Sequence, residues 1–288
     1  MRACGVILRL LPLLVPVALV FGCGVAVTLL QSVGLLMFSY RYDDLWFAYR
    51  ELLVDPWFYR SAGYSLAVAL ASSTISCLLG TMLAYGLWKM PEKLRRYGLI
   101  YKIPLILPHI VVGFLATLVL AKTGVLATVA YRLGLIGSYQ EFPQLLYAGT
   151  GSDLIAAYVY KETPFVILMV YAMLARFDQR QAAVARMLGA GRARVFLTLI
   201  LPFVLPAINT TFLILFVFTL GGFDLPFVIG DSSPGMISLR VYEVFFHRDL
   251  AERPMAMAML SLLLIFSLGF IVLYLRLSAR LAREVRKV

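Results

Sequence analysis

Long apolar stretches alternate with short polar connections along most of this 288-residue chain. Each of the longer stretches can cross the roughly 30 Å hydrocarbon core of a bilayer as a single helix. They are expected at 10–38, 61–88, 99–121, 153–175, 198–221 and 255–276. The first stretch has enough residues to tilt or to include an interfacial turn. The pattern predicts an all-α membrane protein with six transmembrane helices.

The composition supports a membrane location for the whole chain. Hydrophobic residues make up 62% of the sequence and charged residues 14%, and the mean hydropathy is +0.90. Soluble globular domains have close to half apolar and a quarter charged residues. A soluble enzyme or binding domain is therefore excluded as the main body of the chain.

The distribution of cationic residues predicts the orientation in the membrane. With the N-terminus inside, 16 lysines and arginines lie on the cytoplasmic side and 8 on the opposite side, while Lys102 and Lys161 fall within spans. Cytoplasmic loops carry this excess of cations, so both termini are expected to be cytoplasmic. The same bias explains the net charge of +11. No basic–aromatic stripe accompanies that charge, so no nucleic-acid partner is expected.

The N-terminus and the cysteines indicate no further processing or metal site. Arg2 and Arg9 precede an apolar run as in a signal peptide, but the run continues without a small-residue cleavage pattern, so an uncleaved first span is expected. Cys4, Cys23 and Cys77 have no partner at metal-ligand spacing, and they indicate neither a disulfide framework nor a zinc site.

A basic island interrupts the apolar pattern between the fourth and fifth spans. Five arginines occur within 19 residues of segment 176–206, and each would cost roughly 2.5–3.5 kcal/mol at the centre of a bilayer helix. The island must therefore lie in water or against a partner. Asp178 is a suitable N-cap for a helix over 179–188, and Gly189 is a suitable C-terminal glycine. A second helix is expected over 191–200, continuing into the fifth span.

The sequence AVARMLGA, followed by Leu-Pro, resembles the cytoplasmic EAA loop in the permease subunits of binding-protein-dependent ATP-binding-cassette importers. With Gly189 at the motif glycine, Ala183 takes the place of the motif Glu, and Leu201–Pro202 falls at the expected distance. An ordinary basic loop stabilised by a helix hairpin is the alternative. The resemblance assigns a coupling role to Ala183, Val184, Ala185, Arg186, Gly189, Ala190, Gly191, Arg192 and Pro202.

The resemblance implies the remaining organisation. A first helix and external segment would occupy 1–60, a five-helix permease core 61–276 with the EAA-like loop at 176–202, and a basic cytoplasmic tail 277–288. The chain has no Walker A sequence, so ATP and Mg would bind a separate ATPase dimer. That ATPase would seat helix 191–200 and Gly189 in a groove and rotate the attached spans. No cofactor is expected on this chain.

Further partners follow from the same resemblance. They are a second permease subunit, identical or paralogous, a periplasmic or lipid-anchored solute-binding protein, and lipid of the bacterial inner membrane. The external connection 122–152, with a short helix at 125–133, would face the binding protein. The sequence GGFDLP at 221–226 is similar to that in permeases for polyamines, thiamine, ferric ion and phosphonates.

Polar and irregular positions within the spans are candidates for the solute path. Lys161 and Glu162 are ionisable residues inside the fourth span, where such groups face a partner or an aqueous cavity; a structural role is the alternative. Gly222 and Pro226 loosen the end of the fifth span. Asp224 would attract a cationic solute or cap the following turn.

Two other functions fit the sequence less well. A secondary carrier would need no ATPase, but paired ionisable residues or internal repeats are expected of that class, and no convincing repetition among the six spans is seen here. A non-transport membrane scaffold would use the basic loop for a different cytoplasmic partner.

Overall fold

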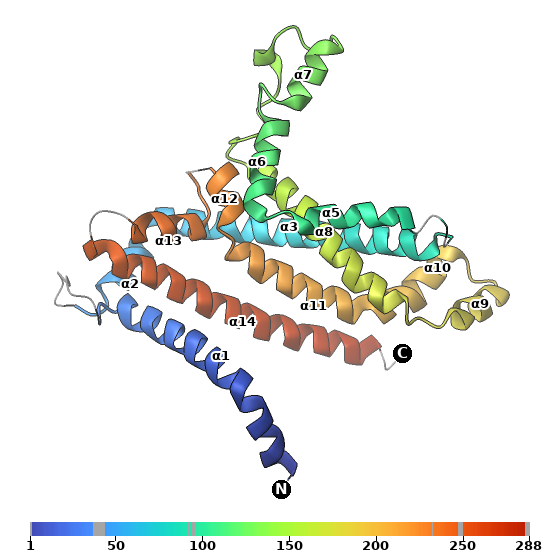
Figure 1. The fold of residues 1–288 in the computed structure, drawn as a ribbon, viewed down its shortest axis with the longest axis horizontal. Helices are drawn as coiled ribbons and strands as arrows, with labels where there is room; N and C mark the ends of the chain where they lie inside the picture. Colours follow the sequence, from blue (N-terminus) through green and yellow to red (C-terminus); the bar gives the residue numbers. More distant parts are fainter. Residues whose placement is uncertain are drawn as a thin grey trace. The chain divides into compact units, whose positions relative to one another are not determined.

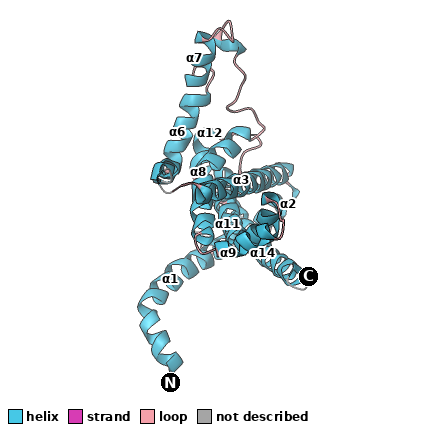
Figure 2. Cartoon of the chain, turned by 90° about the vertical axis from the view of Figure 1, so that its right-hand side faces the viewer, coloured by secondary structure: helices cyan, strands magenta, loops and turns pink. Residues whose placement is uncertain are grey.

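The computed structural model describes residues 2–36, 44–91, 93, 96–231, 233–246 and 250–285, with the side chains of 2–9, 96, 97, 99 and 279–285 excepted. Most of the basic tail expected over 277–288 therefore lies outside the described side chains. Every regular element within these ranges is a helix, and Figure 2 shows no strand among them.

Helices with the length and apolar composition of membrane spans number six in the described residues, as expected from the sequence. They run over Leu10–Ser32, Pro56–Lys89, His109–Arg132, Ser152–Leu174, Arg192–Leu220 and Leu250–Ser278. Most begin or end within a few residues of the expected positions. The third begins at His109 rather than 99 and ends at Arg132 rather than 121, so its range includes the short helix that was expected in the external connection.

The late start of the third span follows from two prolines. A 3₁₀ segment, η1 (Arg96–Lys102), leads into the short helix α5 (Ile103–Ile106), and α6 (His109–Leu120) begins only after Pro108. Proline has no N–H and disfavours a helical conformation in the residue before it. The chain therefore changes direction at Leu107–Pro108, and α6 leaves the line of α5 at a steep angle (Figure 1).

The chain divides into two units by its internal contacts, residues 1–60 with 237–273 and residues 61–236 with 274–288. The first unit contains α1 (Arg2–Ser32), α2 (Phe47–Val54), α13 (Ile237–Phe245), η4 (Leu250–Glu252) and most of α14 (Arg253–Val285). In this unit the hydroxyl of Ser32 lies 2.7 Å from that of Tyr49, which ties the end of α1 to α2.

The second unit holds the features that matter for function. Besides η1, α5 and α6, its helices are α3 (Pro56–Lys89, from Ser61), α7 (Val125–Arg132), η2 (Tyr139–Glu141), α8 (Ser152–Leu174), α9 (Gln179–Met187), α10 (Arg192–Val195), the π-helical turn η3 (Phe196–Ile200), α11 (Leu201–Leu220) and α12 (Asp224–Ile229). Helix α8 is central, because α5, α6, α11 and α12 all pack against it. About half of its residues are accordingly buried.

Candidate functional site

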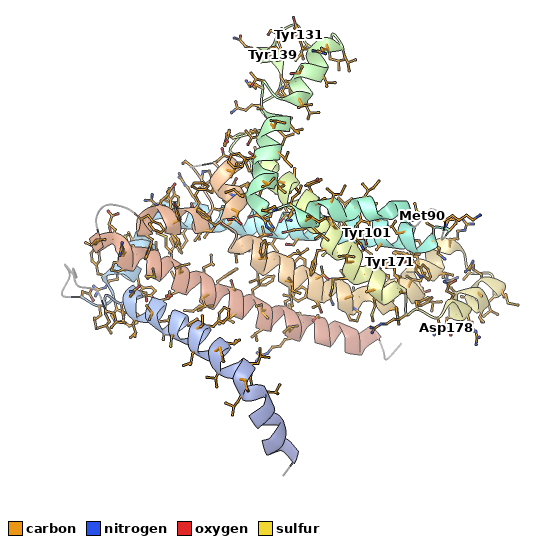
Figure 3. The ribbon with its side chains drawn as sticks, in the orientation of Figure 1. Met90, Tyr101, Tyr131, Tyr139, Tyr171 and Asp178 are labelled. Carbon is orange, nitrogen blue, oxygen red and sulfur yellow. The ribbon has the colours of Figure 1, made fainter. Side chains whose placement is uncertain are left out.

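The basic loop between the fourth and fifth spans is a folded helix–turn–helix. The Asp178 carboxylate accepts a hydrogen bond from the backbone N–H of Arg180 at 3.0 Å, which confirms the expected N-cap. Helix α9 follows over Gln179–Met187, close to the expected 179–188. Figure 3 places Asp178 at the start of this helix, at the end of the unit where α9 and α10 lie. The loop therefore begins at a defined turn.

The turn after α9 needs a glycine at position 189. Gly189 has φ +86°, a conformation that other residues adopt only at a cost. Its N–H donates to the Arg186 carbonyl, and the N–H of Ala190 donates to the Ala185 carbonyl, both at 3.0 Å. This pair of bonds is the Schellman arrangement. It fixes the angle between α9 and the chain that follows, as the sequence predicted for Gly189.

Buried side chains attach the loop firmly to the second unit. Ala182 and Val195 are 1% and 4% exposed, and they belong to one apolar cluster with Trp88 and Phe177. The rings of Trp88 and Phe177 meet edge to face with centroids 6.0 Å apart, and Phe177 meets Phe203 in the same way at 5.3 Å. A displacement of α9 would therefore be passed to α3 and α11 through packed side chains.

The opposite side of α9 presents apolar side chains to the surroundings. Met187 is 87% exposed, Leu188 84% and Val184 56%, and Ala183, at the position of the motif Glu, is exposed as well. The arginines of the loop are also exposed, and these are Arg176, Arg180, Arg186, Arg192 and Arg194. Exposed apolar side chains on a loop that also carries exposed polar residues are typical of a protein-docking site.

The second half of the loop differs from a simple separate helix. The expected helix over 191–200 consists of α10 and η3, and it continues directly into α11, as expected. Gly191 is the N-cap of α10, and Pro202 occupies the first turn of α11. The exposed apolar residues lie mainly on α9, which the sequence pattern did not single out.

The Glu162 carboxylate is buried between three helices. The residue is 3% exposed. Its Oε2 accepts a hydrogen bond from the Ser76 hydroxyl of α3 at 3.2 Å, and its Oε1 accepts one from the Thr219 hydroxyl of α11. A buried carboxylate is tolerated when such donors satisfy it. Glu162 therefore links α8 to α3 and α11.

The neighbouring Lys161 points to a different part of the unit. It is 7% exposed, and its Nζ donates to the carbonyl of Pro104 at 2.6 Å, to that of Leu105 at 3.3 Å and to that of Leu107. The two adjacent ionisable groups thus contact separate partners, as expected for successive residues of a helix.

The segment after α11 approaches α8 closely. A Cβ on Gly222 would lie 2.4 Å from the Tyr158 hydroxyl oxygen, so only glycine fits without a shift of this contact. Tyr158 is 1% exposed, and its hydroxyl has no hydrogen-bond partner among the described residues. Asp224 is exposed in the first turn of α12, whereas Pro226 is buried. The Ser76, Thr219 and Tyr158 partners were not identified from the sequence.

Hydrogen bonds fix the segment before α8 to this unit. The Tyr147 N–H donates to the Asp153 carboxylate at 3.0 Å, and the Gly149 N–H donates to Asp231 at 2.9 Å. Burial raises the pKa of Asp231, and the bond from Gly149 partly offsets this effect.

Helix α7 confirms the helix expected at 125–133. Tyr131 and Tyr139 stack near its tip, with ring centroids 5.2 Å apart (Figure 3).

Comparison with known proteins decides between the functions left open by the sequence. A family model described as "Binding-protein-dependent transport system inner membrane component" matches residues 76–287. The chain belongs to this family. It is a permease subunit of an ATP-binding-cassette importer, not an enzyme, and ATP hydrolysis takes place on a separate subunit. The secondary carrier and the scaffold are thereby excluded.

Individual relatives agree with this assignment. The molybdenum transport system permease protein ModB of Azotobacter vinelandii is 28% identical over 76% of this chain and 93% of its own length. The spermidine/putrescine transport system permease protein PotB of Salmonella typhimurium strain SL1344 is 28% identical over 82% and 80%. The expected similarity to polyamine permeases is confirmed, and molybdate permeases are similar as well.

Solved structures share the fold. A chain of a bacterial alginate transporter, crystallised with its alginate pentasaccharide-bound periplasmic protein, has a TM-score of 0.79 and 19% identity and covers 98% of this chain and 96% of its own length. A chain of the MetNI methionine transporter has a TM-score of 0.54 and 15% identity over 79% of this chain and 95% of its own. The permease fold is thus shared despite low identity.

Proposed function

We propose that this permease receives the motion of its ATPase through the loop at 176–202. The observation that carries the proposal is the exposed apolar side of α9, opposite a face buried in the core of the second unit. Such a helix can bury its outer face against a partner while its inner face moves the helices to which it is attached. Contact would extend from Ala183, Val184 and Arg186 over Gly189, Ala190, Gly191 and Arg192.

The partners of the complete importer follow from this role. An ATPase dimer on the cytoplasmic side binds ATP and Mg. A second permease subunit, identical or paralogous, completes the membrane part of the importer. Both termini of this chain are cytoplasmic. The external segment with α7 faces a periplasmic or lipid-anchored solute-binding protein. The complex lies in the bacterial inner membrane, with lipid around its apolar helices.

The solute path is proposed to run past the segment that joins α11 to α12. Gly222 and Pro226 allow irregular backbone there, which is tolerated where it lines a cavity. Asp224 is exposed in this segment, and its carboxylate would attract a cationic group of the solute. Lys161 and Glu162, both on α8, lie along the border of the proposed path. Asp224→Asn should then raise the KM for uptake of a cationic solute.

Co-purification tests the coupling role of α9. In the assembled importer, the double substitution Met187→Asp and Leu188→Asp should release the ATPase, because two exposed apolar contacts become charged. Both side chains are more than four-fifths exposed, so the fold of the permease itself should be unchanged.

A matched pair on the external side is the control. Leu133 and Leu135 are 69% and 73% exposed, and the same double change to Asp there should leave the ATPase bound. Retention of the ATPase by the α9 variant, or its equal loss from both variants, would refute the proposed docking site.

A further inference from the structure

The bend between α5 and α6 leaves backbone carbonyls without helical donors. The carbonyl of Pro104 would normally accept from the N–H of residue 108, but that residue is a proline. The carbonyl of Leu105 lies in the last turn of α5, where no later helical N–H is available. The N–H of Val111 donates to the Pro108 carbonyl at 3.1 Å and so does not serve Leu107.

Lys161 supplies donors to this same set of carbonyls. A lysine ammonium carries three N–H donors and no acceptor, and the Lys161 Nζ contacts the carbonyls of Pro104, Leu105 and Leu107. The ion pairs found among the described residues are Arg50–Asp44 and Arg240–Glu243, so Lys161 is in neither. Its sequence neighbour Glu162 is bound by hydroxyl groups of other helices.

Carbonyls at the C-terminal end of a broken helix have the chemistry of a cation site. In secondary transporters, the C-terminal ends of half-helices and unwound carbonyls coordinate Na⁺ or H⁺. We propose that the carbonyls of Pro104, Leu105 and Leu107 form such a site here and that the Lys161 ammonium is its permanently tethered cation. Lys161 is thereby a positioning residue, which fixes the direction in which α6 leaves α5.

Lys161 therefore positions α6 and does not bind the solute directly. This inference rests on the proposed solute path. Lys161 is 7% exposed and its Nζ contacts three carbonyls, so an anionic solute would have to displace them. Helix α6 packs against α8 and α12. Its direction therefore sets one wall of the region that contains Gly222 and Asp224, and the loss of the tethered cation would disturb that wall.

A distance measurement across the bend tests the proposal in the complete importer in lipid nanodiscs. Spin labels would be attached at Ile100 and Phe114, which are 68% and 63% exposed, after the native cysteines are replaced by Ala. In Lys161→Met, which keeps the length but loses the charge and donors, the distance distribution should broaden or shift. ATP-driven uptake should fall by about tenfold or more, because the carbonyls lose their charged donor.

The same substitution at an exposed lysine is the control. Lys122→Met should leave both the distance distribution and uptake as in the parent protein. An unchanged distribution in Lys161→Met would overturn the proposal whatever happens to uptake. Because the distance is measured in the permease itself, this result does not depend on whether the ATPase docks at α9.

A second variant covers the case in which Lys161→Met fails to assemble. Lys161→Ala, purified with n-propylammonium, should recover the parent distance distribution, because this small cation replaces the atoms removed. The neutral n-propanol should not restore it. If n-propanol also restored the parent distance distribution, filling the space would be sufficient and no cation would be needed. If neither compound restored it, the three carbonyls would not be a cation site. Either result would overturn the proposal.

Discussion

The turn at Gly189 offers the sharpest test of the coupling loop, because a matched glycine lies two residues away. At both Gly189 and Gly191 an added Cβ would meet nothing within 4 Å, so steric clash is excluded at each site. The two residues differ in backbone conformation, with φ +86° at Gly189 and φ −67° at Gly191. Both glycines also lie in the proposed contact with the ATPase, so a larger loss at Gly189 than at Gly191 reports the backbone strain at Gly189.

The expected size follows from that conformation. Placing alanine in the left-handed region costs about 1–2 kcal/mol, which lowers the population of the turn relative to open forms by about 5- to 30-fold. Gly191→Ala should be close to neutral, because its φ suits any residue and the gain from a less flexible unfolded chain is offset by the N-cap preference for glycine over alanine. Gly189→Val should be more severe than Gly189→Ala, since a β-branched residue at positive φ is a true outlier.

Solute uptake and solute-stimulated ATPase activity in proteoliposomes are the appropriate assays. Gly189→Ala should lower both by up to about 5- to 30-fold, and Gly189→Val should abolish uptake while membrane insertion stays normal. Gly191→Ala should behave as the parent protein. Normal uptake by Gly189→Val, or equal losses in the two alanine variants, would refute the reasoning.

Three further predictions concern individual contacts. Gly222→Ala should reduce uptake because its Cβ meets the Tyr158 hydroxyl, and Tyr158→Phe in the same chain should restore part of it; additive losses in the double variant would contradict this contact. Thr219→Val should lower the free energy of unfolding by about 1–3 kcal/mol in detergent titrations, because the buried Glu162 carboxylate loses a donor, and an unchanged unfolding midpoint would argue against it. Ala183→Glu restores the motif residue at an exposed position and should raise transport-coupled ATPase activity, whereas no change would indicate that coupling here does not use that carboxylate.

The elements whose signals are local were predicted well. Six apolar stretches of membrane-spanning length are visible in the sequence, and the structure has six such helices. The cap at Asp178 and the left-handed turn at Gly189 depend on residue types within a few positions of each other, and both are present. Patterns of this kind need no knowledge of tertiary contacts.

The remaining features depend on contacts between residues far apart in the sequence. The late start of α6 follows from two prolines together with the donors that Lys161 brings from 57 positions away. Glu162 was recognised as an ionisable group inside the fourth span, but its partners on α3 and α11 cannot be chosen from the many hydroxyl residues of those helices. The exposed apolar side of α9 was not evident, because burial of Ala182 determines which face remains outside.

Site-specific photo-crosslinking tests the central claim most directly. A photoreactive residue at Met187, which is 87% exposed on α9, would be activated in the intact importer in membranes, with the same residue at Leu133 beyond α7 as the control. We expect a covalent adduct with the ATPase subunit from position 187 and none from position 133. Absence of the ATPase adduct from position 187 in a complex that hydrolyses ATP and transports, or its appearance from position 133, would contradict the account.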